Sequence, residues 1–341
     1  YGLVGSEMCI RDSAHPLWEL APNERDEFSH WMSGTGDPDF EERRVVDIAP
    51  YKRGELVNWL QQIPSGNHFF HEDTWREVCR THMMNSLFAL SDLAHQDVWP
   101  TERWREALYV WSEKGKAVKS WRYAAPVIQI MSDNTLLELA HSLTRWLQEV
   151  SNSINRHEQI FLELCSRVLA LPLEADTGMT QNGAPLNQPV TEAINHPIGH
   201  VTQALINFWF RREPSDNDLL PSDIEPLFTQ LCDVSFAQYR HGRVLLAASL
   251  IALFRVDRPW AELHLLPLFS WATNSTEAKA VWEGFLWSPR LYRSLLVAFK
   301  PYFLETAEHY AELGEHAQQF AAFLTYVALE QIDGYTVEEF Q

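Results

Sequence analysis

The densest group of basic residues in this acidic chain is Arg240, His241 and Arg243, which stand just before its most apolar segment. A guanidinium group can form two parallel hydrogen bonds with a carboxylate or a phosphate, so these residues could bind an acidic partner. The commoner use of such arginines is to pair with carboxylates of their own domain. The sequence therefore predicts a candidate binding group at Arg240, His241 and Arg243, with internal ion pairing as the alternative.

Tryptophan is abundant, with 14 residues, and the C-terminal third contains four of them: Trp260, Trp271, Trp282 and Trp287. A buried tryptophan usually fills space between helices, whereas an exposed one is typical of the contact residues that dominate protein interfaces. We predict that Trp282 and Trp287 face a partner near the arginines. A carboxylate such as Glu283 could instead form a sugar cleft with these rings, but no pair of carboxylates is singled out by its spacing.

Two pairs of histidines have spacings that occur in metal sites. His196 and His200 are four residues apart, but the glutamate of the helical zinc motif is missing, and Pro197 is better explained as the first residue of a helix. His68 and His71 lack a third and a fourth ligand. Phosphate loops, nucleophile elbows and dinucleotide fingerprints are absent from the sequence as well. We therefore predict no metal site, no cofactor and no catalytic residue in this chain.

Helices must position all of these residues. Apolar residues recur at steps of three and four in the stretches 75–94, 136–150, 161–168 and 317–328. Asp257, two residues before a proline, and the sequence Ser222-Asp-Ile-Glu225 are typical of helix starts. Strand-like alternation is almost absent, and no turn dipeptide between apolar strands predicts a hairpin. We expect an all-α protein whose antiparallel helix pairs stack as an irregular α-solenoid of the HEAT or tetratricopeptide kind, with a compact helical bundle as the alternative.

One segment suggests a boundary. Residues 173–188 are rich in Gly, Pro, Asn and Thr, and they divide a helical block at 14–172 from a C-terminal helical block at 189–341. The segment is either a linker between two domains or a long surface loop within one array. Residues 1–13 resemble a peptide translated from sequencing-adapter DNA at the edge of a metagenomic read, and they are excluded from the fold argument. On that interpretation we expect the native protein to extend upstream.

Composition limits the class of partner. The chain has 341 residues, a net charge of −19 and 46% hydrophobic residues, so it can bury a large core. Its acidity disfavours general binding to nucleic acids or anionic membranes. The apolar run at 244–254 is much shorter than a membrane span and predicts a helix buried on all sides. Cys79, Cys165 and Cys232 form no disulfide framework, which fits a reducing cytoplasm.

Four stretches of the C-terminal part resemble the helical region of a known family. They are HVTQALINFWFR at 200–211, GRVLLAA at 242–248, AVWEGFLWSPRLY at 280–292 and ETAEHY at 305–310. This part of the chain, from His196 to about Thr325, is similar to the C-terminal region of defence-associated sirtuins, which are large bacterial anti-phage proteins. The resemblance implies that a sirtuin-like domain elsewhere in the parent protein destroys NAD, and that the helical region recognises a phage protein and supports oligomer assembly. No NAD-hydrolysing motif occurs in this chain, so no catalytic residue is carried over.

The sequence thus predicts a non-enzymatic recognition and scaffold module of an intracellular anti-phage defence protein. Its partner would be a protein, such as a phage structural protein, and it would form homo-oligomers through the parent protein. Two other functions stay open: a generic α-solenoid adaptor with an unrelated partner, and a helical hydrolase with an acidic aromatic cleft.

Overall fold

The computed structural model divides the chain into two compact units, one formed by residues 1–49 and 62–74 and the other by residues 50–61 and 75–341. The residues that it describes are 45–62, 71–181, 184–185, 188–287, 290–330, 332–336 and 339. In the smaller unit, β1 (Val45–Asp47) pairs in parallel with β2 (His71–Asp73). After these strands, the backbone N–H of Ala49 donates a hydrogen bond to Oγ1 of Thr74 over 2.9 Å.

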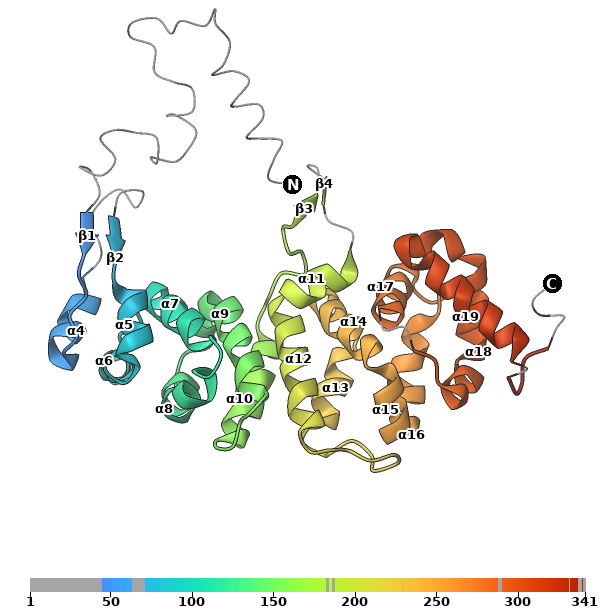
Figure 1. The fold of residues 1–341 in the computed structure, drawn as a ribbon, viewed down its shortest axis with the longest axis horizontal. Helices are drawn as coiled ribbons and strands as arrows, with labels where there is room; N and C mark the ends of the chain where they lie inside the picture. The colour runs from blue at the N-terminus through green and yellow to red at the C-terminus, as the bar shows by residue number, and fades with distance from the viewer. Residues whose placement is uncertain are drawn as a thin grey trace, which may run out of the picture. The chain divides into compact units, whose positions relative to one another are not determined.

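The larger unit is built from α-helices, so the predicted all-α class is confirmed (Figure 1). Its first half contains α4 (Arg53–Leu60), α5 (Trp75–Thr81), α6 (Met83–Ala94), α7 (Thr101–Trp111), α8 (Ala117–Gln129), α9 (Asp133–Ser151) and α10 (Glu158–Ala170). Its second half contains α11 (Pro189–Asn195), α12 (Pro197–Phe210), α13 (Glu225–Leu231), α14 (Arg240–Ala248), α15 (Leu250–Val256), α16 (Arg258–Trp260), α17 (Ser275–Leu286), α18 (Arg293–Glu308) and α19 (Ala317–Leu329). A short 3-10 turn, η1 (Ala237–Tyr239), leads into α14.

Packing follows chain order: many helices contact the next helix but one along the chain. The contacting pairs are α4 with α6, α5 with α7, α6 with α8, α7 with α9, α8 with α10, α10 with α12, and α12 with α14. The helix pair α9 and α12 also makes one of the most extensive contacts. Helices from either side of segment 173–188 thus pack against each other. Tyr239 strengthens this junction by donating a hydrogen bond from its hydroxyl to the carbonyl oxygen of Leu169 over 2.9 Å.

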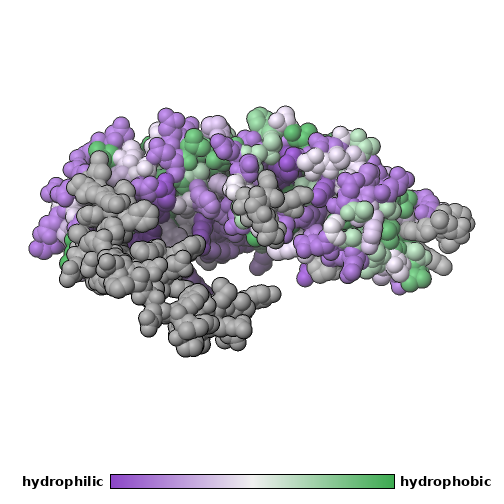
Figure 2. All heavy atoms as spheres, turned by 90° about the horizontal axis from the view of Figure 1, so that it is seen from above, coloured by the Kyte–Doolittle hydropathy of each residue, from purple (hydrophilic) through white to green (hydrophobic). Residues whose placement is uncertain are grey.

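Large aromatic side chains fill the space between the helices. Seven tryptophans are among the largest side chains that are fully buried: Trp75, Trp104, Trp111, Trp121, Trp146, Trp209 and Trp282. Many ring pairs pack edge to face, as between Trp121 and Phe161 at 78° and between Phe269 and Trp282 at 87°. Such edge-to-face contacts add to the free energy gained from apolar burial. Figure 2 shows hydrophilic residues over much of one face, with hydrophobic residues in smaller groups.

Several local predictions were wrong. The stretch 75–94 is not one helix, since the backbone turns at His82 (φ −118°, ψ 42°) between α5 and α6. The apolar run at 244–254 is likewise divided between α14 and α15, which meet at Ser249. Ser222 forms no capping box, because α13 begins at Glu225 with no side-chain cap. Asp257 does cap a helix as predicted, by accepting a hydrogen bond from the N–H of Trp260 over 3.0 Å.

The sequence prediction also missed the strand pairs. Besides β1 and β2, β3 (Thr180–Gln181) pairs in an antiparallel manner with β4 (Ala184–Pro185). The two residues between them are Asn182 and Gly183, a dipeptide that favours two-residue hairpin turns. The flanking residues form no alternating apolar pattern, so the sequence does not predict strands there.

Candidate functional site

Arg243 lies in the interior, although the sequence made it a candidate for a surface contact. Its side chain is wholly buried, and its Nε donates a hydrogen bond to Oε2 of Glu277 over 2.8 Å. Its Nη1 donates to the carbonyl oxygens of Leu231 (3.2 Å) and Asp233 (2.8 Å). Arg243 therefore links α14 to α17 and to the end of α13, which is the internal pairing that the sequence left as the alternative.

Arg240 shares the same carboxylate but lies nearer to solvent. Its Nε donates to Oε1 of Glu277 over 2.7 Å, and its side chain is 35% exposed. Glu277 is 3% exposed, and its backbone N–H is bound by the side chain of Asn274, the N-cap of α17. One buried carboxylate thus binds two guanidinium groups and neutralises only one of their two positive charges. The exposed part of Arg240 therefore presents positive charge at the surface.

His241 is buried against His196. The two rings stack with their centroids 4.0 Å apart, and each Nε2 lies 2.8 Å from a backbone carbonyl oxygen, that of Ala175 for His241 and that of Glu174 for His196. Burial lowers the pKa of His241 to about 4, so both rings are used as neutral N–H donors. His196 also accepts the N–H of Ile198 and caps α12, as its position before a proline suggested.

The two predicted tryptophans have opposite environments. Trp282 is wholly buried and donates a hydrogen bond from its Nε1 to the carbonyl oxygen of Phe269 over 3.1 Å. Trp287, the residue that ends α17, is 58% exposed. Among the predicted binding residues, only Arg240 and Trp287 therefore present substantial surface.

Arg240 and His241 line a small pocket between α11, α14, α17 and η1. Its volume is about 100 Å³, and it is lined by Ala175, Pro189, Glu192, Ala237, Arg240, His241, Val244, Thr276, Lys279 and Ala280. This volume suits a single side chain and lies below the roughly 300–1,000 Å³ of small-molecule pockets. Arg240 and Lys279 give the rim two cations, and Glu192 gives it one carboxyl, whose pKa is raised mainly by burial.

Glu283, which the sequence suggested for a sugar cleft, lies one helical turn beyond this pocket. Its Oε1 accepts a hydrogen bond from the N–H of Val190, in the first turn of α11, over 3.1 Å. Burial raises its pKa to about 7, a value that would suit a general acid. The contact it makes in the structure is structural, because it satisfies an N–H at the start of a helix that has no side-chain cap of its own.

One face of α17 joins the pocket to the exposed tryptophan. Thr276, Ala280, Glu283 and Trp287 follow one another at steps of four, three and four, and Lys279 lies beside this row. At about 3.6 residues per turn, such spacing places the side chains on the same side of the helix. The pocket, the bond to α11 and Trp287 therefore follow one another along α17.

Sequence reasoning missed Glu192, Glu277 and Lys279. Glu277 and Lys279 are separated from Arg240 by more than thirty-five residues, and no motif connects the three helices. The only available signal was the helical spacing from Thr276 to Trp287, which is equally typical of a buried stripe.

Within the part of the chain that the structure describes, no three His, Cys, Asp or Glu side chains are grouped as metal ligands, and no helix is long and apolar enough to cross a bilayer. No protein-family model, no curated protein and no solved structure matches this chain.

Proposed function

We propose that this chain is a helical protein-recognition module, and that the face of α17 carrying the pocket and Trp287 binds its partner. The observation that carries the proposal is the position of these two features on one side of one helix. A pocket of about 100 Å³ accepts one side chain, and an exposed tryptophan is the residue type most often found at the energetic centre of interfaces.

Charge favours a partner with an acidic side chain at the pocket. Arg240 and Lys279 line the pocket. The carboxylate of Glu277 is shared between Arg240 and the buried Arg243, so it does not fully neutralise the charge of Arg240. A carboxylate entering the pocket would form charge-assisted hydrogen bonds with these cations. The surrounding chain is strongly acidic, so a local cationic site selects where such a partner docks rather than attracting it from a distance.

The order of helix packing supports a stacked array, which we propose in preference to a closed bundle. In such an array each helix pair contacts only its neighbours, so stability is local. A substitution that weakens the contact between α14 and α17 should therefore raise amide hydrogen exchange in those helices and leave exchange in α5 and α7 unchanged. Faster exchange throughout the larger unit would favour the bundle.

The resemblance to defence-associated sirtuins adds an identity for the partner. We propose on that basis that the partner is a phage protein and that binding is relayed to an NAD-hydrolysing domain of the parent protein. For such a relay, the phage protein must bind one arrangement of the helices more tightly than another. Binding of a purified phage structural protein that is lost in the Trp287→Ala or Lys279→Glu variant would support this identity.

The docking face can be tested before the partner is known. A displayed library of random peptides is selected on the immobilised chain, and the dissociation constants of the enriched peptides are measured by fluorescence anisotropy. We expect the enriched peptides to contain Asp or Glu. Trp287→Ala and Lys279→Glu should each weaken binding by roughly 30-fold or more, as expected for a residue contributing about 2 kcal/mol.

Two control variants match these changes in residue type. Leu263→Ala removes an apolar side chain that is 69% exposed on another element, and Lys114→Glu reverses an exposed charge outside the pocket. Both should bind the selected peptides like the wild type. Peptides whose affinity is unchanged by Trp287→Ala and Lys279→Glu would place the recognition surface elsewhere and contradict the proposal.

A further inference from the structure

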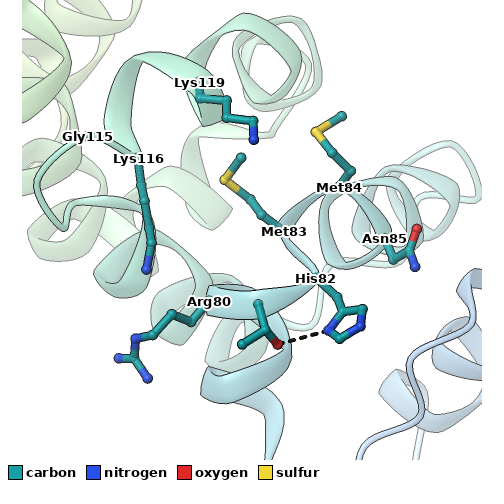
Figure 3. Close-up of a pocket in the computed structure, with 9 residues that line it drawn as sticks. Arg80, His82, Met83, Met84, Asn85, Gly115, Lys116 and Lys119 are labelled. Carbon is teal, nitrogen blue, oxygen red and sulfur yellow. Dashed lines mark hydrogen bonds between the residues drawn. The ribbon is translucent and has the colours of Figure 1, made fainter.

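A second, larger pocket lies where α5, α6 and α8 meet. Its volume is about 330 Å³, and it is lined by Arg80, Thr81, His82, Met83, Met84, Asn85, Gly115, Lys116 and Lys119. Figure 3 shows Lys119 extending from α8 towards Met83 and Lys116 extending towards Arg80. The volume is at the lower end of the roughly 300–1,000 Å³ range of small-molecule sites.

The pocket concentrates positive charge in a chain whose net charge is −19. Arg80 and Lys116 both bind Glu113, at 2.7 Å and 2.6 Å, and Arg80 also contacts Glu77 at 3.1 Å. Lys119 is exposed, and it forms no ion pair with any residue that the structure describes. Three cations therefore face two carboxylates, neither of which lines the pocket. Among the described residues, none pairs with the ammonium group of Lys119.

Two helices begin in the wall of this pocket. Met83, Met84 and Asn85 form the first turn of α6, and Lys116 immediately precedes α8, in whose first turn Lys119 lies. Neither helix has a side-chain cap at its N-terminus. The first N–H groups of a helix lack intrahelical partners and carry partial positive charge, so two such ends beside three cations favour a bound anion.

Local structure holds the wall in place. The ring of His82 stacks on Tyr51 with centroids 4.6 Å apart, and its Nδ1 lies 2.8 Å from the hydroxyl of Thr81, which fixes the turn between α5 and α6 (Figure 3). Gly115 has φ +83°, a left-handed conformation that other residues adopt at a cost, and it brings the chain back into α8. Both pocket edges are thus preformed.

We infer that this pocket binds the phosphate group of a small phosphorylated molecule. The phosphate would accept hydrogen bonds from Lys119, from Lys116 or Arg80, and from the N–H groups of Met83 and Met84, because the N–H of Asn85 already donates to the carbonyl oxygen of His82. The side chains of Met83 and Met84 would provide an apolar surface for the organic part. This site uses other helices than the docking face of α17, so the inference does not rest on the proposed function.

Isothermal titration calorimetry of the 341-residue chain at constant ionic strength tests the inference. The probes are inorganic phosphate and adenosine monophosphate, and sodium chloride is the reference salt. Binding of both probes is expected. Adenosine monophosphate should bind more tightly than inorganic phosphate, because the methionines contact its organic part. Equal affinities would assign the site to free inorganic phosphate. Lys119→Gln should weaken binding of both probes by about tenfold, the value of one charge-assisted hydrogen bond.

Lys114→Gln is the matched control, because it removes an exposed lysine of the turn before α8 that does not line the pocket. It should change affinity by less than about twofold, as expected for a screened surface charge. Nuclear magnetic resonance provides a second measurement, in which phosphate should shift the amide signals of Met83 and Met84. No binding at millimolar phosphate, or equal losses in the Lys114 and Lys119 variants, would overturn the inference.

Discussion

Replacing Glu277 by Gln should destabilise the larger unit more than most single changes of similar size. Glu277 is the carboxylate that Arg240 and Arg243 share, and Arg243 is wholly buried. Gln keeps the shape and one acceptor oxygen but removes the negative charge. The guanidinium of Arg243 would then stay buried with three backbone carbonyl groups and a neutral amide as its hydrogen-bond acceptors.

The expected cost follows from this burial. Removing one partner of a buried ion pair costs about 3–5 kcal/mol, because an uncompensated charge is left in the interior. Because Gln retains one amide oxygen as an acceptor, we expect Glu277→Gln to lower the free energy of unfolding by about 3 kcal/mol, near the lower end of this range. Glu102→Gln is the control, since Glu102 pairs with Arg105 on the surface and its side chain is 77% exposed. Exposed pairs contribute about 0–1 kcal/mol.

Urea denaturation followed by circular dichroism measures both variants. With a urea dependence of about 3 kcal/mol per molar, the midpoint should fall by roughly 1 M for Glu277→Gln and hardly change for Glu102→Gln. The double variant Glu277→Leu with Arg243→Met should recover most of the loss, because a buried pair can be replaced by apolar side chains at little cost. A midpoint for Glu277→Gln within about 0.2 M of the wild type would refute the argument that the carboxylate neutralises a buried charge.

Three further predictions concern protonation and close packing. Burial lowers the pKa of His200 to about 4, so the neutral ring stabilises the fold above pH 6.5 and this stabilisation is lost as the pH falls towards 4. Urea titrations of the wild type should therefore show a lower free energy of unfolding at pH 5 than at pH 7, and in His200→Gln this decrease should be smaller by up to about 2 kcal/mol. Burial raises the pKa of Glu283 to about 7, so the contribution of this side chain to stability is greatest below pH 4.5 and declines as the pH rises through 7. The stability of Glu283→Gln relative to the wild type should be higher at pH 8 than at pH 5, by about 1–2 kcal/mol after allowance for the partial exposure of the side chain. An equal difference at both pH values would contradict this. A Cβ on Gly284 would lie 2.2 Å from the carbonyl oxygen of Val244, so Gly284→Ala should lower the melting temperature by several degrees as α14 and α17 are forced apart, whereas Gly54→Ala, with open space around it, should not lower it.

The sequence was sufficient for the class of fold and for individual helix signals. Apolar residues at steps of three and four predicted helices, and Asp257 before a proline predicted a cap, because both depend on interactions within a few residues of the chain. The same local reasoning failed at His82 and Ser249, where the apolar pattern continues through a change of backbone direction. Periodicity records which side of the chain is buried, and it does not show where neighbouring helices require a turn.

Tertiary structure decided which of the candidate site residues are buried and which are exposed. The sequence grouped Arg240, His241 and Arg243 just before an apolar segment, whereas the structure places all three inside α14, and two of them line the pocket. Whether an arginine or a tryptophan serves the interior or the surface depends on which residues of distant segments surround it, and Glu277 and Lys279 reach this site only when α17 packs on α14. Burial and charge neutralisation are properties of the whole environment in three dimensions, so a linear pattern can propose the residues of a site but cannot assign them to inside or outside.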